Sequence, residues 1–136
     1  MPEGILFLCV ANSARSQMAE GIARSLAPPG VKIWSAGSRP TNVRPEAIEV
    51  LKEIGIDISG HRSKAVAEIP AGNVDTVITL CAEEECPVFL GKAEKLHWEL
   101  PDPAAVTGSK LEGLAAFRET RNELHRRITA FFKGRC

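Results

Sequence analysis

The chain has 136 residues, which is enough for one domain with a sizeable core. Its 17 Lys and Arg residues balance its 17 Asp and Glu residues. This balance argues against a nucleic-acid or membrane-surface binder, which would carry a basic excess or stripe, so any anion site must be local. No apolar run approaches the roughly 18 residues of a membrane span, and Met1-Pro2-Glu3 lacks the basic start of a signal peptide. We therefore expect one soluble, cytoplasmic, monomeric domain over residues 1–136.

The first half of the chain alternates between strand and helix patterns. The continuous apolar run over residues 4–10 is typical of a strand buried on both faces. A helix is predicted to begin near Ala14 and to end at Pro28, because apolar residues recur every four positions between them. Residues 31–36 alternate like a strand, and a second helix is predicted from Pro45 to a stop at Gly55. The side chains expected to face inward from these two helices are Ala14, Met18, Ile22, Leu26, Ala47, Ile48, Leu51 and Ile54.

The second half continues this alternation. Residues 74–80 and 95–98 read as a third and a fourth strand. Ser109 and Glu112 have the spacing of a capping box and predict the start of a long helix. Strands that alternate with helices predict a small α/β domain with a mostly parallel sheet. The apolar side of the long helix is expected to comprise Leu111, Leu114, Phe117, Leu124, Ile128 and Phe131.

The segment between the first strand and the first helix has the features of an oxyanion site. In a parallel open sheet, ligands bind beyond the carboxyl ends of strands and beside helix N-termini. Cys9 closes the first strand, and Arg15 lies in the first turn of the next helix, where it can clamp an anion through two hydrogen bonds. The backbone N–H groups between them can form a concave anion nest. The residues expected to bind the anion with Arg15 are Val10, Ala11, Asn12, Ser13 and Ala14, of which Asn12 tolerates a left-handed backbone.

Cys9 is the candidate nucleophile of this site. The positive end of the helix and the Arg15 guanidinium favour its thiolate form, and the Ser16 hydroxyl is placed to donate a hydrogen bond to the sulfur. The alternative is that Cys9 is an inert core thiol and Arg15 an exposed helix residue. The preceding strand, the following helix and the small residues between them favour the catalytic interpretation. The loop also differs from the Walker phosphate loop, which has glycines and a lysine but no nucleophile.

The stretch Cys-x5-Arg-Ser followed by "NSARSQMAEG" resembles the low-molecular-weight tyrosine phosphatase fold, and in particular the thioredoxin-coupled arsenate reductases built on it. The resemblance extends over nearly the whole chain through "SAGSRP", "GIDISGHRS", "VITLCAEEECP" and "LPDPA". It implies a four-stranded parallel sheet in the order 2-1-3-4, flanked by helices. In that order the first and third strands are neighbours, so Cys9 and Cys81 would emerge at one edge of the sheet, together with Asp102.

The resemblance also implies a redox relay without a cofactor. The Cys9 thiolate would attack arsenate while Asp102 helps water to depart. Cys81 would then attack the arsenic adduct, and arsenite would leave. Cys86 would resolve the resulting Cys9–Cys81 disulfide, and thioredoxin would reduce the Cys81–Cys86 disulfide by thiol–disulfide exchange. Phosphate and sulfate would compete with arsenate. From its place as the last residue, we expect Cys136 to be a free thiol outside the relay.

Two alternative functions remain open from the residues. A phosphatase that hydrolyses phosphate monoesters needs only Cys9, Arg15 and the general acid Asp102. The chain has no Tyr, and the residues that follow Asp102 offer no aromatic wall for an aryl substrate, which favours a small inorganic oxyanion. A non-catalytic oxyanion or redox binding module is the second alternative.

We expect no metal ion. A zinc site made from Cys81, Cys86 and His97 lacks a fourth ligand nearby. The resemblance further implies that some relatives bind potassium through positions that correspond to Asn12, Glu20, Ser35 and an aspartate. The last of these positions is Lys64 in this chain. An ammonium group can replace the cation there, so we expect no specific dependence on potassium.

Overall fold

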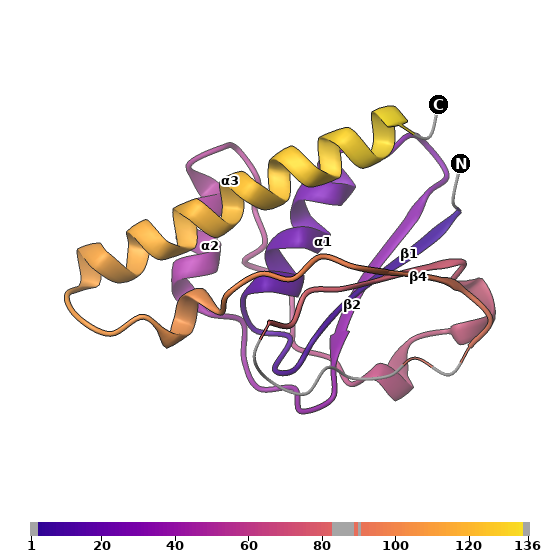
Figure 1. Ribbon diagram of the computed structural model, residues 1–136, viewed down its shortest axis with the longest axis horizontal. Helices are drawn as coiled ribbons and strands as arrows, with labels where there is room; N and C mark the ends of the chain where they lie inside the picture. The colour runs from indigo at the N-terminus through magenta and orange to yellow at the C-terminus, as the bar shows by residue number, and fades with distance from the viewer. Residues whose placement is uncertain (1–2, 83–88, 90, 135–136) are drawn as a thin grey trace.

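The computed structural model describes residues 3–82, 89 and 91–134. These residues form one α/β unit in which strands and helices alternate along the chain (Figure 1). No described helix is both long and apolar enough to cross a membrane. The strands and α-helices, in chain order, are β1 (Gly4–Cys9), α1 (Arg15–Leu26), β2 (Lys32–Gly37), α2 (Pro45–Lys52), β3 (Thr76–Thr79), β4 (Glu94–His97) and α3 (Lys110–Gly134).

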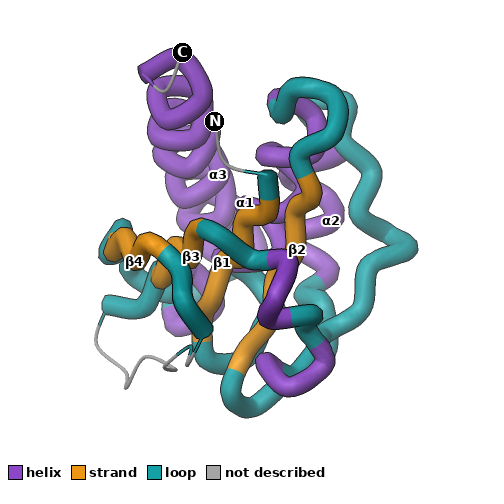
Figure 2. Tube along the Cα trace, turned by 90° about the vertical axis from the view of Figure 1, so that its right-hand side faces the viewer, coloured by secondary structure: helices purple, strands orange, loops and turns teal. Residues whose placement is uncertain are grey.

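The four strands form a parallel sheet in the order β2-β1-β3-β4, which confirms the predicted fold class and strand order. Figure 2 shows the strands in this order and the three α-helices together on one side of the sheet. Register places Cys9 opposite Gly37 on β2 and Leu8 opposite Thr79 on β3. The carboxyl ends of β1, β2 and β3 therefore meet at one edge, where a parallel sheet presents its ligand site.

β1 is buried on both faces, as its continuous apolar run predicts. Ile5 and Phe7 belong to the larger core cluster, which also includes Met18 of α1 and Leu124 of α3. The alternate residues of the strand pack into a second cluster on the opposite face. That second cluster lies beneath two short 3-10 helices rather than an α-helix (Figure 2). Its buried members are Leu6, Leu8, Ala36, Ile69, Val74, Val77 and Phe89.

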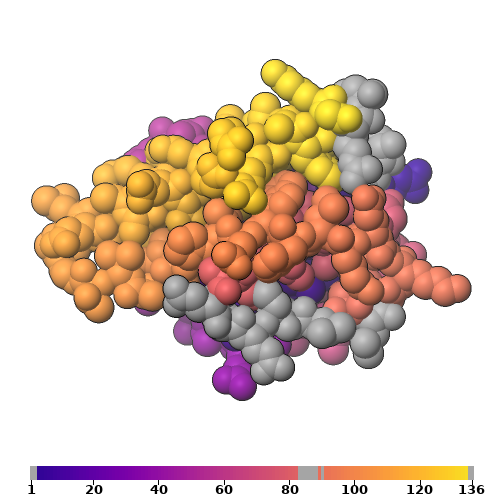
Figure 3. Space-filling model, in the orientation of Figure 1, coloured from indigo at the N-terminus to yellow at the C-terminus, as the bar shows by residue number. Residues whose placement is uncertain are grey.

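The long helix α3 begins at the predicted capping box and forms the upper edge of the molecule in Figure 3. The Glu112 backbone N–H donates to Ser109 Oγ, and the Ser109 N–H donates to Glu112 Oε1, each at 3.2 Å. These reciprocal bonds satisfy N–H groups that the first turn of a helix leaves without partners. The capping-box prediction is confirmed.

Three predicted core positions are wrong. Leu111 is 75% exposed because α3 extends beyond the sheet at its first turn. Ile54 is 40% exposed because α2 ends at Lys52, after which the chain turns toward Gly55, whose φ is +80°. Leu26, at the last turn of α1, is also exposed. Near the end of α3 the buried aromatic residue is Phe132, whereas Phe131 is half-buried against the core.

A cluster of charged side chains links the end of α2 to α3 through hydrogen bonds. Glu53, which follows α2, accepts two hydrogen bonds from Arg118 Nε, at 2.9 and 3.1 Å, and one each from Arg118 Nη2 and Arg121 Nη1, at 2.7 Å. Arg121 Nη1 also donates to the Val50 carbonyl at 2.8 Å. The hydrogen bonds from Arg118 and Arg121 lower the pKa of Glu53 from 4.5 to about 2. The carboxylate thus stabilises the folded chain when it is ionised.

We expect Glu53→Gln to lower the Tm at pH 7, because both arginines lose their anionic partner. A carboxyl whose pKa is depressed on folding contributes stability above its unfolded value and loses it as pH falls through the folded value. The deficit should therefore shrink between pH 4.5 and about 2. Thermal unfolding over this range measures it, with Glu119→Gln on the exposed side of α3 as the control. An equal deficit at pH 7 and pH 2 would contradict this account.

Candidate active site

The loop between β1 and α1, residues 9–15, is held from behind through its backbone carbonyl groups; we call it the anion loop. Backbone N–H groups of the segment after β2 donate to three of its carbonyl oxygens. Arg39 donates to Val10 at 2.9 Å, and Thr41 donates to Ala11 at 3.1 Å. Arg44 donates to the Ser13 carbonyl at 2.9 Å. These bonds fix the orientation of the three peptide groups to which the carbonyls belong.

The central carbonyl of the anion loop is held by side chains instead. Asn12 O accepts from Gln17 Nε2 at 3.2 Å and from Ser63 Oγ at 2.7 Å. Asn12 is also the one described residue other than glycine with a positive φ, at 49°. The left-handed conformation that its residue type allows is therefore present, as predicted.

These contacts orient the N–H groups of the loop. In a trans peptide the C=O and the following N–H point in opposite directions, and the described part of the chain contains no cis peptide. Carbonyls held at the rear of the loop therefore turn the following N–H groups toward the pocket that the loop lines. These N–H groups belong to Ala11, Asn12, Ser13 and Ala14. The N-cap residue of α1 makes no side-chain capping bond, so the positive end of the helix is left for an anion.

Gly37, at the end of β2, permits the close approach of the anion loop. A Cβ atom at this position would lie 2.3 Å from the Val10 carbonyl oxygen and 2.9 Å from the Asn12 backbone nitrogen. Because both of those atoms belong to the backbone of the loop, any side chain here would displace it. The "SAGS" stretch thus supplies a glycine where no other residue fits.

A pocket of ≈ 140 Å³ brings the predicted nucleophile, clamp and acid together. Cys9, Arg15 and Asp102 line it with four other residues of the anion loop, Val10, Ala11, Ser13 and Ala14. None of the described residues around it is aromatic. Asp102 follows β4 and accepts a hydrogen bond from the Ala104 N–H at 3.0 Å, which orients its carboxyl group.

The Cys9 thiol and the Arg15 guanidinium are both almost fully buried. Cys9 Sγ lies 2.8 Å from Ser16 Oγ, so the predicted contact between sulfur and hydroxyl is present. Arg15 Nη1 donates to the Leu100 carbonyl at 3.0 Å and to the Leu80 carbonyl at 3.4 Å. The chain segments that follow β3 and β4 therefore hold the guanidinium against the anion loop.

Cys81 follows β3 next to the anion loop. Because Leu8 is opposite Thr79, Cys9 is level with Leu80, and Cys81 lies one residue further on. Its side chain is buried. Cys81 is part of a disulfide, whereas Cys9 is a free thiol. The cysteine that completes this disulfide lies outside the described residues, as both Cys86 and Cys136 do.

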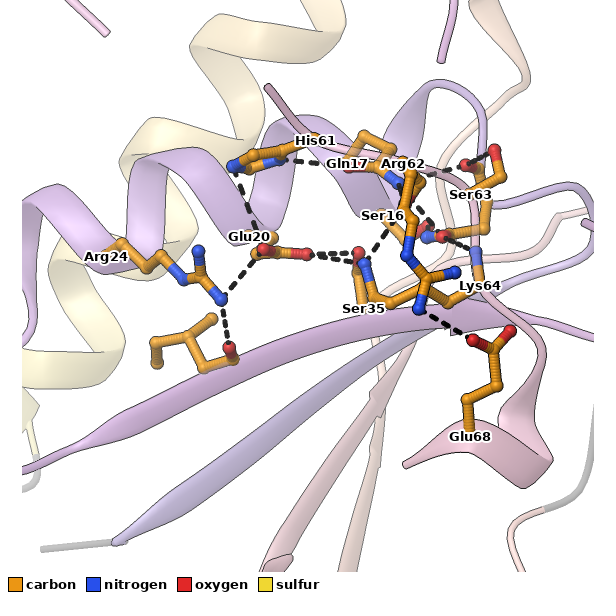
Figure 4. A network of polar contacts seen from close by, with 12 residues as sticks. Ser16, Gln17, Glu20, Arg24, Ser35, His61, Arg62, Ser63, Lys64 and Glu68 are labelled. Atoms are coloured by element: carbon orange, nitrogen blue, oxygen red, sulfur yellow. Dashed lines mark hydrogen bonds and ion pairs between the residues drawn. The ribbon is translucent and has the colours of Figure 1, made fainter. Parts of the chain in front are cut away.

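Behind the anion loop, the buried carboxylate of Glu20 lies at the centre of a polar cluster (Figure 4). It accepts a hydrogen bond from Ser35 Oγ and pairs with Arg24 at 3.0 Å. Lys64 Nζ lies 3.6 Å from Glu20 Oε1. His61 Nε2 lies 3.8 Å from Glu20 Oε2, yet burial lowers the pKa of this imidazole and favours its neutral form.

This cluster does not fit the potassium ion that the family resemblance implies. The Lys64 ammonium already brings positive charge to Glu20. Another of the implied side-chain ligands, Asn12 Oδ1, accepts hydrogen bonds from Gln17 Nε2 at 2.9 Å and from the Lys64 N–H at 2.8 Å. Both of its lone pairs are therefore used. Among the described residues, no group of three or more His, Cys, Asp and Glu side chains is arranged to hold a metal ion.

Sequence reasoning missed the contribution of Gln17, Arg62 and Ser63 to the anion loop. Gln17 is a polar residue on a helix that reads as amphipathic, yet it is fully buried. The sequence offered one signal, because Gln17 lies five residues after Asn12 and within the quoted motif. Its other partners, His61 and Arg62, are more than 40 residues away and could be found only from the structure.

Comparison with known proteins agrees with the fold. The family profile described as low molecular weight phosphotyrosine protein phosphatase matches residues 4–134. An arsenate reductase of Halalkalibacterium halodurans is 40% identical over 129 residues, which cover 93% of each protein. The solved structure of an arsenate reductase in its phosphate-binding state has a TM-score of 0.81 at 33% identity over 98% of each chain. A thioredoxin-dependent arsenate reductase of Corynebacterium glutamicum has a TM-score of 0.72 at 30% identity, covering 98% of this chain and 61% of that one.

We expect phosphate affinity and Tm to be equal in potassium chloride and sodium chloride at one ionic strength, because the Lys64 ammonium pairs with Glu20. Lys64→Asp should instead make the protein more stable in potassium than in sodium. Lys64→Gln, which removes the ammonium without adding a carboxylate, is the control. Calorimetric phosphate titration and thermal unfolding measure both quantities. A preference of the unaltered protein for potassium would refute this interpretation of Lys64.

Proposed function

The chain belongs to the low molecular weight phosphotyrosine protein phosphatase family, and on that premise we propose that it is an arsenate reductase that converts arsenate to arsenite. The observation that carries the proposal is the small pocket shared by Cys9, Arg15 and Asp102, with Cys81 one residue beyond the position level with Cys9. A phosphate monoesterase has no use for that second thiol. The name of the 40% identical Halalkalibacterium protein supports the same activity.

The anion loop binds arsenate and presents it to Cys9. The inward N–H groups and the Arg15 guanidinium neutralise the charge of the tetrahedral anion. The Cys9 thiolate forms a bond to arsenic(V) as the bond from arsenic to one hydroxyl group of arsenate breaks, and that hydroxyl takes a proton from Asp102 and leaves as water. Asp102 lines the same pocket, so proton donor and nucleophile can act on one arsenic atom.

Cys81 carries out the reduction. Its thiolate attacks the Cys9 sulfur, and the electron pair of the breaking sulfur–arsenic bond passes to arsenic. Arsenic(V) becomes arsenic(III) and leaves as arsenite, while the two thiols are oxidised to a Cys9–Cys81 disulfide. The parallel order β1-β3 supports this step because it makes the strands that precede the two cysteines direct neighbours.

Cys86 and thioredoxin complete the cycle. The Cys86 thiolate attacks Cys81 and releases Cys9 as a thiolate, which leaves a Cys81–Cys86 disulfide. The two thiols of thioredoxin then reduce that disulfide and are themselves oxidised. A free Cys9 beside an oxidised Cys81 is the distribution expected at this last stage. The name of the thioredoxin-dependent relative from Corynebacterium supports the choice of reductant.

We also propose the compartment, the competing anions and the oligomeric state of the enzyme. A relay of reduced thiols regenerated by thioredoxin needs a reducing compartment, so we place the protein in the cytoplasm. Phosphate and sulfate share the tetrahedral shape of arsenate and should compete for the anion loop. The chemistry uses one copy of the chain and no cofactor, and we assign a monomer.

Arsenite production in the presence of thioredoxin, thioredoxin reductase and NADPH tests the activity, with hydrolysis of para-nitrophenyl phosphate measured in parallel. Reduction without appreciable hydrolysis is the expected result. Hydrolysis without reduction would replace the proposal with a phosphatase that uses Cys9 and Asp102. Neither activity, with phosphate affinity retained, would make the protein an oxyanion-binding module.

Replacing the cysteines one at a time separates their roles. We expect Cys9→Ser to abolish arsenate reduction and any phosphatase activity, because both need the nucleophile. Cys86→Ser should retain phosphate binding but stop after a single turnover with thioredoxin as the sole reductant. Cys136→Ser is the matched control and should turn over normally. Steady multiple turnover by Cys86→Ser would remove Cys86 from the relay and point to Cys136.

A further inference from the structure

Gln17 of α1 connects the anion loop to the segment from His61 to Lys64 through a fully buried amide. Its Nε2 atom donates to Asn12 Oδ1 at 2.9 Å, to the Asn12 carbonyl at 3.2 Å and to the Arg62 carbonyl at 2.9 Å. Three acceptors surround one end of the amide, so this end must carry the hydrogens. The Oε1 end consequently faces His61 Nδ1, at 3.0 Å, and accepts from it. The orientation of Gln17 is therefore fixed from both ends (Figure 4).

That orientation fixes the next two hydrogen bonds toward Cys9. Because Asn12 Oδ1 accepts from Gln17, the Nδ2 end of the Asn12 amide faces Ser16 Oγ, to which it donates at 2.7 Å. Ser16 Oγ accepts from Asn12 with one lone pair, and its hydroxyl hydrogen can donate to the Cys9 sulfur, 2.8 Å away, which accepts it when ionised. Each donor in the series Gln17, Asn12, Ser16 thus points toward the sulfur.

We propose that Gln17 is a positioning residue that sets the direction of this series of hydrogen bonds and thereby favours the thiolate form of Cys9. A series of hydrogen bonds with one direction strengthens the last donor, and a hydroxyl that donates to sulfur stabilises the thiolate over the thiol. Gln17 touches neither the anion nor the sulfur, so it acts only through Asn12 and Ser16. The proposal rests on Cys9 as the nucleophile of the proposed function.

Charged groups lie at both ends of this series of hydrogen bonds. Arg15 and Asp102 line the pocket together with Cys9. Glu20 and Arg24 of α1 and Lys64 of the segment after α2 form the polar cluster next to His61. Lys64 also contributes its backbone N–H to Asn12 Oδ1 at 2.8 Å, which supports the same amide orientation. Replacing Gln17 with methionine removes its donors without adding a group that titrates or changing the length of the side chain.

The test measures the alkylation rate of Cys9 by iodoacetamide against pH in the full-length chain with its other three cysteines changed to serine. Only the thiolate reacts, so the midpoint of the profile reports thiolate formation without any need for arsenate reduction. Gln17→Met should raise that midpoint by a few tenths of a pH unit, roughly 0.2–0.6, because the loss of an upstream bond weakens the last hydrogen bond to the charged sulfur without removing it. Ile22→Val, a core change on the same helix, should lower the Tm and leave the midpoint in place.

A folded Gln17→Met chain with the original midpoint would overturn the proposal and leave Gln17 a purely structural residue. If this variant does not fold, NMR spectra of the chain that keeps Gln17, with the same three cysteines changed to serine, decide the question. The resonances of the side-chain amide protons of Gln17 and Asn12 should then shift over the same pH range in which Cys9 becomes reactive toward iodoacetamide. They should stop doing so in Cys9→Ser. Amide-proton resonances that stay unchanged over that pH range would also overturn the proposal.

Discussion

The left-handed Asn12 residue is the constraint on which the site depends. At a residue other than glycine, this backbone conformation costs about 1–2 kcal/mol. Hydrogen bonds to the Asn12 carbonyl and side-chain amide arrive from Gln17, Ser63 and Lys64. At about 1 kcal/mol net for each buried bond, together they exceed that cost. The loop can therefore hold its carbonyls outward and its N–H groups inward before any anion binds.

The parallel sheet adds the remaining groups to this preorganised loop. Neighbouring strands end level with one another, so the segments after β1, β3 and β4 supply a thiol, a second thiol and a carboxyl group to one edge. Arg15 links them, because its guanidinium donates to the carbonyls of Leu80 and Leu100. The same family fold can thus support hydrolysis at phosphorus or redox chemistry at arsenic. In the mechanism that we propose, Cys81, which follows β3, is the residue that distinguishes the two.

Local sequence patterns predicted those parts of the molecule that depend on local physics. The apolar run of β1, the capping box at Ser109 and the left-handed Asn12 follow from the residues themselves. The strand order came from the family resemblance, because periodicity says nothing about which strands pair. The clusters around Glu53 and Gln17 join residues more than 40 positions apart, and no local pattern marks them. Exposure of Leu111 was mispredicted because periodicity cannot show where a helix passes beyond the sheet.

The central claim is that electrons reach arsenic from Cys9 and Cys81 together. It is tested most directly by one turnover of Cys86→Ser with arsenate, without thioredoxin, followed by peptide mapping of the non-reduced protein. The account predicts one arsenite released per chain and a disulfide that joins the Cys9 peptide to the Cys81 peptide, because the resolving thiol is absent. Arsenite released while Cys81 remains a free thiol, or no arsenite despite bound arsenate, would contradict it.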